Sequence, residues 1–447
     1  MSFGSATSGD GFDVASTVSQ IIAIQQAVET PWKNQLTQLQ AQDTALSSIG
    51  TDLASLSTSL QSLTDFNGIF AQKDGASSDT SIVALSSATA SAVASSHEIV
   101  VNSLAQTSSV YSSAVASGDT ISGSISIQVG SGTAQTITVD DSTNTLQSLA
   151  AAINAEGIGV TASIISDSNG QRLSLVSGTS GAAGELTVSN SLSDTTTGSD
   201  ITTQVGHDGK DASLTVDGIA IQSSSNTIST AIPGVTFQIL NTSSNAVQVQ
   251  ITNDTSSVAS ALSSFVTAYN QVVSDIKTQE GKDSSGNAEP LYGDPTLALI
   301  QQQLGGSLIS GGNSGTISSL SQLGIDVNQD GTLTFTQSTA LSALNSSFSD
   351  AVGYFQNSGS YGSNLTQTLN GLSSTRTTGA VYLALQQNSS QESTLNKNIS
   401  DTEARIATQK TQLTTELNEA NQILQSIPSQ LDEVDKMYAA VTGYNTK

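Results

Sequence analysis

The clearest candidate for chemistry is the acidic loop at residues 326–331, which reads Asp-Val-Asn-Gln-Asp-Gly. Oxygen-bearing side chains at positions one, three and five and a glycine at position six match the first half of an EF-hand calcium loop. Position twelve is Gln337, where a calcium loop needs a glutamate that supplies two ligand oxygens. The same residues fit a β-hairpin that turns at Asp330-Gly331, and we expect this hairpin and no metal site. Its apolar strand residues would be Ile325, Val327, Leu333 and Phe335.

Nucleophilic catalysis has few candidate residues. The chain has two histidines, His97 and His207, and no cysteine. His97 lies at the start of an apparent strand and His207 in an apparent loop, and neither position indicates the convergence with serine and carboxylate that a Ser–His–Asp triad requires. The absence of cysteine excludes disulfides, thiolate metal sites and thiol nucleophiles. We therefore expect no catalytic, cofactor-binding or metal-binding residue, no cofactor and no enzymatic activity.

Charge excludes two classes of partner. The 447 residues include 37 acids and 12 bases, for a formal charge of −25. Binders of nucleic acid or of anionic membranes need clustered Lys and Arg, so we expect neither partner.

No stretch approaches the roughly 20 apolar residues of a membrane span, and residues 1–13 lack the basic and apolar regions of a Sec signal peptide. The length favours two to four domains.

Apolar residues near the N-terminus are spaced alternately four and three residues apart, which is typical of a helix that keeps one seam against a partner helix. Gln25, Gln35 and Gln42 interrupt the first half of this seam. Pro31 is expected to divide the helix, because it lacks a backbone N–H and restricts Thr30 before it. The seam residues are Val14, Val18, Ile21, Val28, Trp32, Leu39, Leu46, Ile49, Leu53, Leu56, Leu60 and Leu63.

The C-terminal segment repeats the pattern. A step of four residues from Leu413 to Leu417 breaks the alternation once, as a stutter in a coiled coil does, and Pro428 is expected to interrupt the helix near its end. The seam residues are Leu395, Ile399, Ile406, Leu413, Leu417, Leu424, Ile427, Leu431 and Val434. A third helix is predicted from the spacing of Val258, Leu262, Phe265, Tyr269, Val272 and Ile276.

Residues 80–255 change to a period of two, which predicts half-buried strands with one polar face. Asp217-Gly218 is a two-residue hairpin signal. A helix is expected over residues 146–154, capped by Asn144 with Gln147 and ended by Gly157. The predicted fold class is multidomain α+β, with N- and C-terminal helices paired into a coiled-coil or helical-bundle stalk and mainly antiparallel β head domains inserted between them. An ordinary helical bundle that does not assemble is the alternative.

The order of several short motifs resembles the flagellar hook-associated protein 2 family, the filament cap of bacterial flagella. The resemblance covers nearly the whole chain, and residues 144–177 are also similar to a motif shared by flagellin and hook proteins. The other motifs are Gly11-Phe12-Asp13-Val14, Asp217-Gly218-Ile219, Ser225-Asn226-Thr227-Ile228, Pro233-Gly234-Val235-Thr236, Phe265–Asn270, Leu323-Gly324-Ile325 and Gly331-Thr332-Leu333.

This resemblance implies an organisation in four parts. Residues 1–40 and 395–447 would form terminal coiled-coil legs. Residues 41–75 and 255–394 would form a helical bundle with a small β-hairpin. Residues 76–116 and 206–254 would form an inner β domain, and residues 117–205 an outer β domain.

The resemblance also implies a function. Copies of the chain would form a ring, usually a pentamer, at the filament tip, where exported flagellin folds and polymerises. Further partners would be the hook-associated junction proteins and a cytosolic export chaperone, and export would use the flagellar type III route without a cleaved signal peptide. Two alternatives remain open here, namely another axial flagellar protein (flagellin or a hook–filament junction protein) and a surface adhesin that acts through its β domains.

Overall fold

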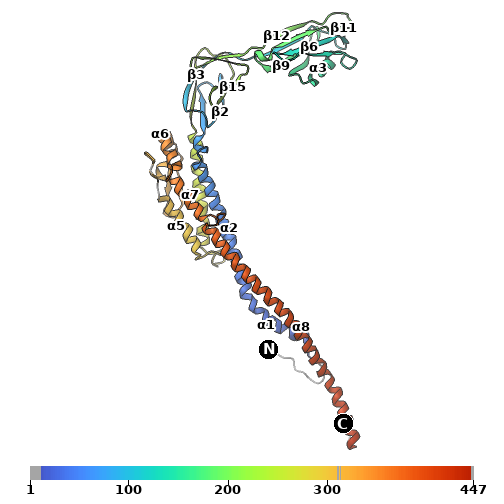
Figure 1. Ribbon diagram of the computed structural model, residues 1–447, viewed down its shortest axis with the longest axis vertical. Helices are drawn as coiled ribbons and strands as arrows, with labels where there is room; N and C mark the ends of the chain where they lie inside the picture. The colour runs from blue at the N-terminus through green and yellow to red at the C-terminus, as the bar shows by residue number, and fades with distance from the viewer. Residues whose placement is uncertain (1–11, 310–311, 313, 444–447) are drawn as a thin grey trace. The chain divides into compact units, whose positions relative to one another are not determined.

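The computed structural model describes residues 12–309, 312 and 314–443. It divides into two compact units, of which unit 1 comprises residues 1–64 and 259–447 and unit 2 comprises residues 65–258. Unit 1 is thus built from both ends of the chain, and unit 2 from the middle (Figure 1). This confirms the predicted α+β class with a β-rich region inserted between terminal helices.

Helices make up most of unit 1. The longest, α8, has 63 residues and is therefore about 95 Å long at 1.5 Å per residue. The elements are α1 (Val14–Gln26), η1 (Ala27–Glu29), α2 (Thr30–Thr64), α4 (Thr255–Gln279, whose first four residues belong to unit 2), α5 (Pro295–Ile309), η4 (Leu320–Leu323), β18 (Ile325–Val327), β19 (Leu333–Phe335), α6 (Gln337–Gln356), α7 (Tyr361–Leu372) and α8 (Ala380–Thr442).

The two prolines of the terminal helices behave differently. The predicted break near Pro31 is confirmed, since the short 3₁₀ helix η1 separates α1 from α2. Thr30 nevertheless keeps helical dihedral angles, because proline is tolerated in the first turn of a helix, where its missing N–H would have no partner. The predicted interruption at Pro428 is wrong, since α8 continues through it. The side chains around Pro428 are exposed, so water can solvate the backbone carbonyl group that loses its hydrogen bond.

The predicted third helix is confirmed as α4. Its six spaced apolar residues expose between 0 and 3% of their surface, and they contribute to the core of the helical bundle. The bundle core also contains Tyr354, Phe355 and Tyr361 at the junction of α6 and α7. The rings of Tyr354 and Tyr361 are stacked with centroids 5.2 Å apart, and Phe355 meets both edge-on.

Unit 2 is β-rich, and its strands pair antiparallel throughout. The sheets have the strand orders β1-β17-β3-β13-β14, β15-β16-β2, β12-β4-β9-β8, β10-β6-β7 and β11-β5. The strands are β1 (Lys73–Ser77), β2 (Val83–Ala88), β3 (Ser95–Ser103), β4 (Thr107–Ser112), β5 (Ile121–Ser122), β6 (Ser124–Val129), β7 (Gln135–Thr138), β8 (Val160–Asp167), β9 (Gly170–Ser180), β10 (Leu186–Asn190), β11 (Ser193–Asp194), β12 (Thr203–His207), β13 (Ala212–Val216), β14 (Ile219–Ser223), β15 (Thr227–Ile232), β16 (Val235–Ile239) and β17 (Val247–Asn253). The helices are α3 (Leu146–Ala155), η2 (Ile69–Ala71) and η3 (Ala182–Gly184).

Two hydrophobic cores organise unit 2. One is formed by buried residues between positions 83 and 105 together with residues between 212 and 251. The other is formed by buried residues between positions 110 and 201, and it includes the apolar face of α3. Alternation places one face of strands such as β13, β16 and β17 in a core, as the period of two predicted.

Two predictions for unit 2 concern short stretches, the turn at Asp217-Gly218 and the two ends of α3. Asp217 and Gly218 have φ of 51° and 82°, as the type I′ turn of a two-residue hairpin requires, so that prediction is confirmed. The predicted cap of α3 is wrong by one residue, because Thr145 and Ser148 form the capping box. Thr145 has the extended backbone conformation of an N-cap residue. Gly157 is left-handed with φ of 62°, as expected after the helix.

The two histidines both lie in strands. His97 is in β3, as predicted, whereas the loop expected at His207 is wrong. His207 is the last residue of β12 and pairs with Ser109 across a β-bulge. In the described part of the chain, no helix is both long and apolar enough to span a membrane.

Candidate assembly surface on the terminal helices

The apolar seam of α2 begins in the bundle. Its side chains from position 46 to position 63 expose at most 2% of their surface. They face a core to which α6, α7 and α8 contribute, since α2 packs against all three helices. These predicted seam residues therefore hold the bundle together. They are Leu46, Ile49, Leu53, Leu56, Leu60 and Leu63.

The opposite end of the seam joins α1 to α8. Val14, Val18 and Ile22 form a small apolar cluster with Ile406 of α8. Phe12, Leu413 and Leu417 lie at its border, partly buried. Just before α1, the backbone N–H of Phe12 donates a hydrogen bond of 3.0 Å to Asn421 Oδ1. The helices formed by the two ends of the chain therefore lie side by side (Figure 1).

Between these apolar stretches the seam is polar. Lys33 Nζ donates to Glu29 Oε2 at 2.9 Å and to Glu403 Oε1 of α8 at 3.0 Å. These bonds, first that to Glu29, raise the pKa of Lys33 above its ordinary value. Asn388 of α8 donates to Asp43 of α2 at 2.8 Å. Leu39 is buried beside this stretch, as are Leu395 and Ile399 of α8.

Three buried oxygen atoms in the polar stretch have no hydrogen-bond partner among the residues that the structure describes: Gln25 Oε1, Glu29 Oε1 and Glu392 Oε1. Glu29 is the extreme case, since its side chain is only 2% exposed. A buried polar atom without a partner costs about 1–3 kcal/mol. The middle of the seam is therefore held less firmly than its two apolar ends.

The predicted seam register is shifted near the break between α1 and α2. Ile21 is only half-buried, and Ile22 takes the buried position instead. Val28 is 59% exposed, whereas Glu29 beside it is buried. Trp32 is half-buried. The 3₁₀ helix explains part of the shift, because it has 3.0 residues per turn and changes the phase of the faces. The Glu29–Lys33 spacing of four residues was the available signal for an ion pair at this point.

The last predicted seam residues have no partner within the described chain. Leu424, Ile427, Leu431 and Val434 are 40–59% exposed, and α1 does not reach them because its N-terminus lies opposite Asn421. Their 3–4 spacing places them on one face of α8, which we call the distal strip. Residues 1–11 and 444–447 lie outside the described structure. The distal strip is thus an apolar helix face without a partner among the described residues.

Two carboxyl groups meet where α2 packs on α4. Asp52 shares a hydrogen bond with Asp275, and partial burial followed by this contact raises the pKa of Asp52 to about 6. Gln271 Nε2 donates to Asp275 Oδ1 at 2.9 Å. The second carboxyl oxygen of Asp52, Oδ2, is buried and has no hydrogen-bond partner within the described part of the chain. No sequence pattern connects positions that are 223 residues apart.

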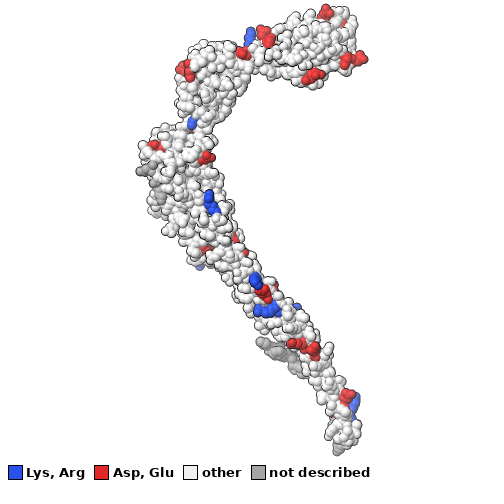
Figure 2. Space-filling view, viewed as in Figure 1, with Lys and Arg blue, Asp and Glu red and all other residues white. Residues whose placement is uncertain are grey.

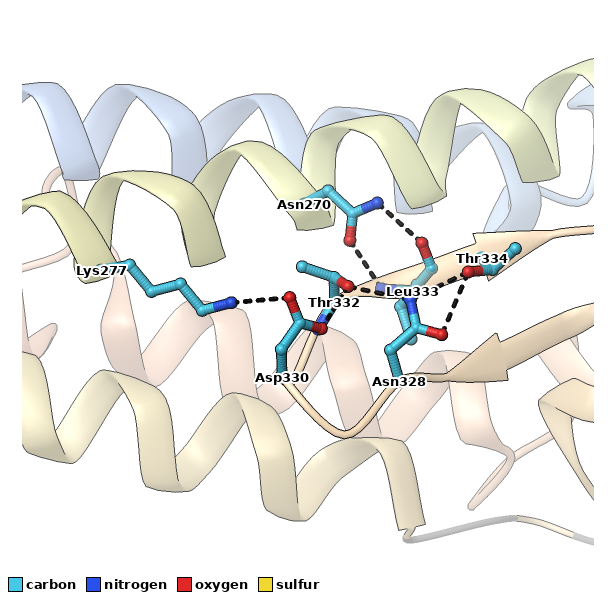
Figure 3. A network of polar contacts seen from close by, with 7 residues as sticks. All are labelled: Asn270, Lys277, Asn328, Asp330, Thr332, Leu333 and Thr334. Atoms are coloured by element: carbon cyan, nitrogen blue, oxygen red, sulfur yellow. Dashed lines mark hydrogen bonds and ion pairs between the residues drawn. The ribbon is translucent and has the colours of Figure 1, made fainter.

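The predicted hairpin at residues 325–335 is confirmed, and Figure 3 shows how it is fixed to α4. Asn270 accepts a hydrogen bond of 2.7 Å from the N–H of Leu333 and donates one of 2.8 Å to its carbonyl group. Asp330 binds Lys277 at 2.9 Å and Thr332, and these bonds hold the pKa of Asp330 far below its ordinary value. Asp330, the expected turn residue, therefore serves as an anchor of the hairpin.

The described part of unit 1 has a small hollow beneath the hairpin, and larger open grooves along α8 and between α2 and α4. A cavity of about 90 Å³ lies beneath the hairpin, which is small beside the roughly 300–1,000 Å³ of ligand pockets. Within residues 12–309, 312 and 314–443, no three His, Asp or Glu side chains are placed to hold a metal ion. Figure 2 shows few charged side chains on the visible face of the molecule.

These features define a class of protein: a multidomain α+β chain that pairs its terminal helices and presents an uncovered apolar helix face. Two family models match, the flagellar hook-associated protein 2 N-terminus over residues 10–108 and the flagellar hook-associated protein 2 C-terminus over residues 209–439. The chain belongs to the flagellar hook-associated protein 2 family, which comprises flagellar filament cap proteins. The family match favours this function over the two alternatives, another axial component and an adhesin.

Known relatives agree with this assignment. The chain is 29% identical over 376 residues to the B-type flagellar hook-associated protein 2 of Pseudomonas aeruginosa, covering 77% of this chain and 78% of the relative. It is 30% identical over 357 residues to flagellar hook-associated protein 2 of Escherichia coli O157:H7, covering 73% and 74%. The crystal structure of the flagellar cap protein FliD D1-D2-D3 domains from Escherichia coli covers 77% of this chain and 99% of that chain, with a TM-score of 0.57 and 27% identity.

Proposed function

We propose that copies of this chain form a ring, with five as the expected number, at the tip of the flagellar filament. Exported flagellin would fold and polymerise beneath this ring. The observation that carries the proposal is the distal strip on α8, because an apolar helix face without an intrachain partner is suited to a helix of a neighbouring subunit or of the filament. The predicted seam is proposed as the assembly surface at its exposed positions, first of all in the distal strip, while its residues from Leu46 to Leu63 are buried in the bundle core.

The energetics suit an attachment that must be made and broken repeatedly. Full burial of a leucine or isoleucine side chain stabilises by about 1.5–3 kcal/mol, and the strip residues are already about half covered by their own helix. Docking would therefore recover only part of this energy at each position. The polar middle of the seam would let the end of the stalk separate without disrupting the bundle core.

The organisation into four parts belongs to the same proposal. The two hydrophobic cores of unit 2 support the division into two β domains. We propose an inner β domain at residues 76–116 and 206–254 and an outer one at residues 117–205, although Val110 and Val115 contribute to the outer core. The helices support the legs at residues 1–40 and 395–447 and the bundle at residues 41–75 and 255–394. The proposed partners are flagellin, the hook-associated junction proteins and a cytosolic export chaperone, with export by the flagellar type III route.

Deletion of the gene tests the proposal at the level of the cell. We expect short or absent filaments, lost motility and unpolymerised flagellin in the medium. Normal filaments of full length would contradict a role in elongation.

A paired substitution tests the surface itself. Leu424→Glu with Leu431→Glu places two charges in the distal strip, whereas Gln425→Glu with Ser429→Glu places two charges on the opposite face of the same helix. We expect the first variant to be secreted but to fail in complementing the deletion, and the second to restore motility. Equal complementation by both variants would show that the strip does not contribute to assembly.

A further inference from the structure

Three side chains of unit 2 form a continuous chain of hydrogen bonds. Ser95 Oγ lies 2.9 Å from His97 Nε2, and His97 Nδ1 lies 2.7 Å from Asp217 Oδ2. Ser95 and His97 are on β3, and Asp217 is in the turn between β13 and β14. The expectation that His97 has no serine and carboxylate near it is therefore wrong. The order serine, histidine and aspartate is that of the triad that activates a serine nucleophile.

The aspartate is held in position by the backbone. The N–H of Glu98 donates to Asp217 Oδ1 at 2.9 Å, and the N–H of Asp217 donates to the carbonyl group of Glu98 at 2.9 Å. The bond from Glu98, followed by that from His97, lowers the pKa of Asp217, so that it stays ionised. An ionised Asp217 retains the imidazole proton on Nδ1, which leaves Nε2 free to accept the proton of Ser95.

The serine hydroxyl has a second acceptor nearby, because Ser95 Oγ also lies 2.8 Å from the carbonyl oxygen of Val93. A hydroxyl group has one proton, so the two acceptors compete for it. With a neutral imidazole, Nε2 can accept this proton. With a protonated imidazole, Nε2 is a donor and the hydroxyl proton turns to Val93. Activation of Ser95 therefore depends on the protonation state of His97.

The three side chains lie between an apolar sheet on one side and solvent on the other. Ser95 and His97 pair with Ile251 and Val249 of β17, which are 1% and 0% exposed. The side chain of His97 keeps 20% exposure and that of Asp217 46%. Packing against an apolar sheet strengthens the hydrogen bonds, while the exposure of His97 and Asp217 leaves this edge open to solvent.

A backbone donor also points to this edge. In an antiparallel strand the N–H groups of alternate residues point to the same side. The N–H of Ser96 therefore points to the same edge as that of Glu98. The pairing of β13 with β3 begins only at Ile99, so β13 does not extend alongside Ser96. This N–H is placed to donate to an oxyanion formed next to Ser95.

We propose that Ser95 is a nucleophile toward small activated acyl esters, with His97 as its general base and Asp217 as a positioning residue. Ser95 Oγ forms a bond to the acyl carbon while its proton moves to His97 Nε2. The bond from the acyl carbon to the leaving alkoxide breaks, and His97 returns the proton to that alkoxide. Water then attacks the acyl–Ser95 ester with His97 again as base, and this releases the carboxylic acid and restores the serine.

Covalent labelling of the full chain tests this proposal. An alkyl fluorophosphonate reacts with activated serines by forming an O–P bond with loss of fluoride, and peptide mass spectrometry locates the label. We expect the label on Ser95 and not on Ser96, the exposed serine beside it on the same strand. Absence of label on Ser95 after prolonged exposure, or equal labelling of both serines, would overturn the proposal without any variant.

Variants separate activation from mere exposure. General-base assistance contributes about 10²–10⁴-fold, so His97→Gln should slow labelling of Ser95 at least about 100-fold. It should also abolish the rise of the labelling rate with pH and the hydrolysis of p-nitrophenyl acetate. Asp217→Asn keeps a residue that tolerates a positive φ, and it should alter the pH profile. Ser87→Ala, which changes an exposed serine on β2 outside the proposed site, should change neither readout, and an unchanged rate in His97→Gln would refute the mechanism.

Discussion

Replacement of Asp52 by Asn tests whether the carboxyl pair between α2 and α4 opposes folding at neutral pH. Asp52 has an ordinary pKa of 3.8, and in the folded chain burial and the neighbouring Asp275 raise it to about 6. The folded state therefore binds the proton more tightly than the unfolded state. The stability that this proton provides is complete below pH 4, decreases as the pH rises toward 6 and is lost above it.

The expected magnitude follows from the shift. One pKa unit corresponds to 1.36 kcal/mol, so a shift of about two units would correspond to roughly 3 kcal/mol at full strength. Asp52 is only partly buried, and solvent screening reduces such contributions. We therefore expect about 1 kcal/mol. Asn keeps the shape of the side chain, offers an N–H to Asp275 and carries no charge. Asp52→Asn should thus stabilise unit 1 by about 1 kcal/mol at pH 7.5 and leave it unchanged at pH 4.

Thermal unfolding followed by circular dichroism at 222 nm reports mainly on the helices of unit 1. For a unit of this size, 1 kcal/mol corresponds to about 2–4 °C in Tm. The matched control is Asp43→Asn, which makes the same substitution on the same helix where the partner is the neutral donor Asn388. It should show no gain at pH 7.5. A gain for Asp52→Asn that is equal at pH 4 and pH 7.5, or no gain at either, would refute the reasoning.

Three further perturbations concern other described contacts. Tyr354→Phe removes a buried hydroxyl group that has no hydrogen-bond partner among the described residues, so the free energy of unfolding from urea titration should stay unchanged or rise by up to about 1 kcal/mol. Lys33→Met leaves the buried carboxylate of Glu29 without its ion pair, so amide hydrogen exchange in η1 and α1 should accelerate by about tenfold. Asn270→Ala removes both hydrogen bonds to the backbone of Leu333, so the hairpin should be destabilised by about 2 kcal/mol or more, measured by exchange of its amides.

Each of these has a matched control. Tyr111→Phe removes a hydroxyl group that donates to Gln204 at 2.9 Å and should bring no gain in stability. Lys397→Met breaks an exposed pair with Asp401 and should leave exchange in α1 unchanged. Asn328→Ala removes bonds to exposed threonine side chains and should cost less than Asn270→Ala. A gain in stability for Tyr111→Phe, or faster exchange in α1 for Lys397→Met, would contradict the role given to Tyr354 or to Lys33. A larger loss for Asn328→Ala than for Asn270→Ala would contradict the role given to Asn270.

The sequence determined the features that depend on neighbours along the chain. Alternating apolar spacing set the helices, because a buried helix face repeats every 3.6 residues. Asp217-Gly218 set a hairpin, because its turn requires two residues with positive φ. The sequence could also be recognised as belonging to the flagellar hook-associated protein 2 family, since the order of its short motifs is retained over nearly the whole chain.

The tertiary structure alone decided which residues meet across the chain. Helix packing selected Ile22 and Glu29 for burial in place of the expected Ile21 and Val28. Neighbouring helix positions lie about 100° apart, so a change in the phase of the helix exchanges which of the two is buried. Contacts such as Asp52 with Asp275 and His97 with Asp217 join positions more than 100 residues apart. The spacing of residues along the chain does not predict such pairs, because the distance between the two side chains depends on how every intervening element packs.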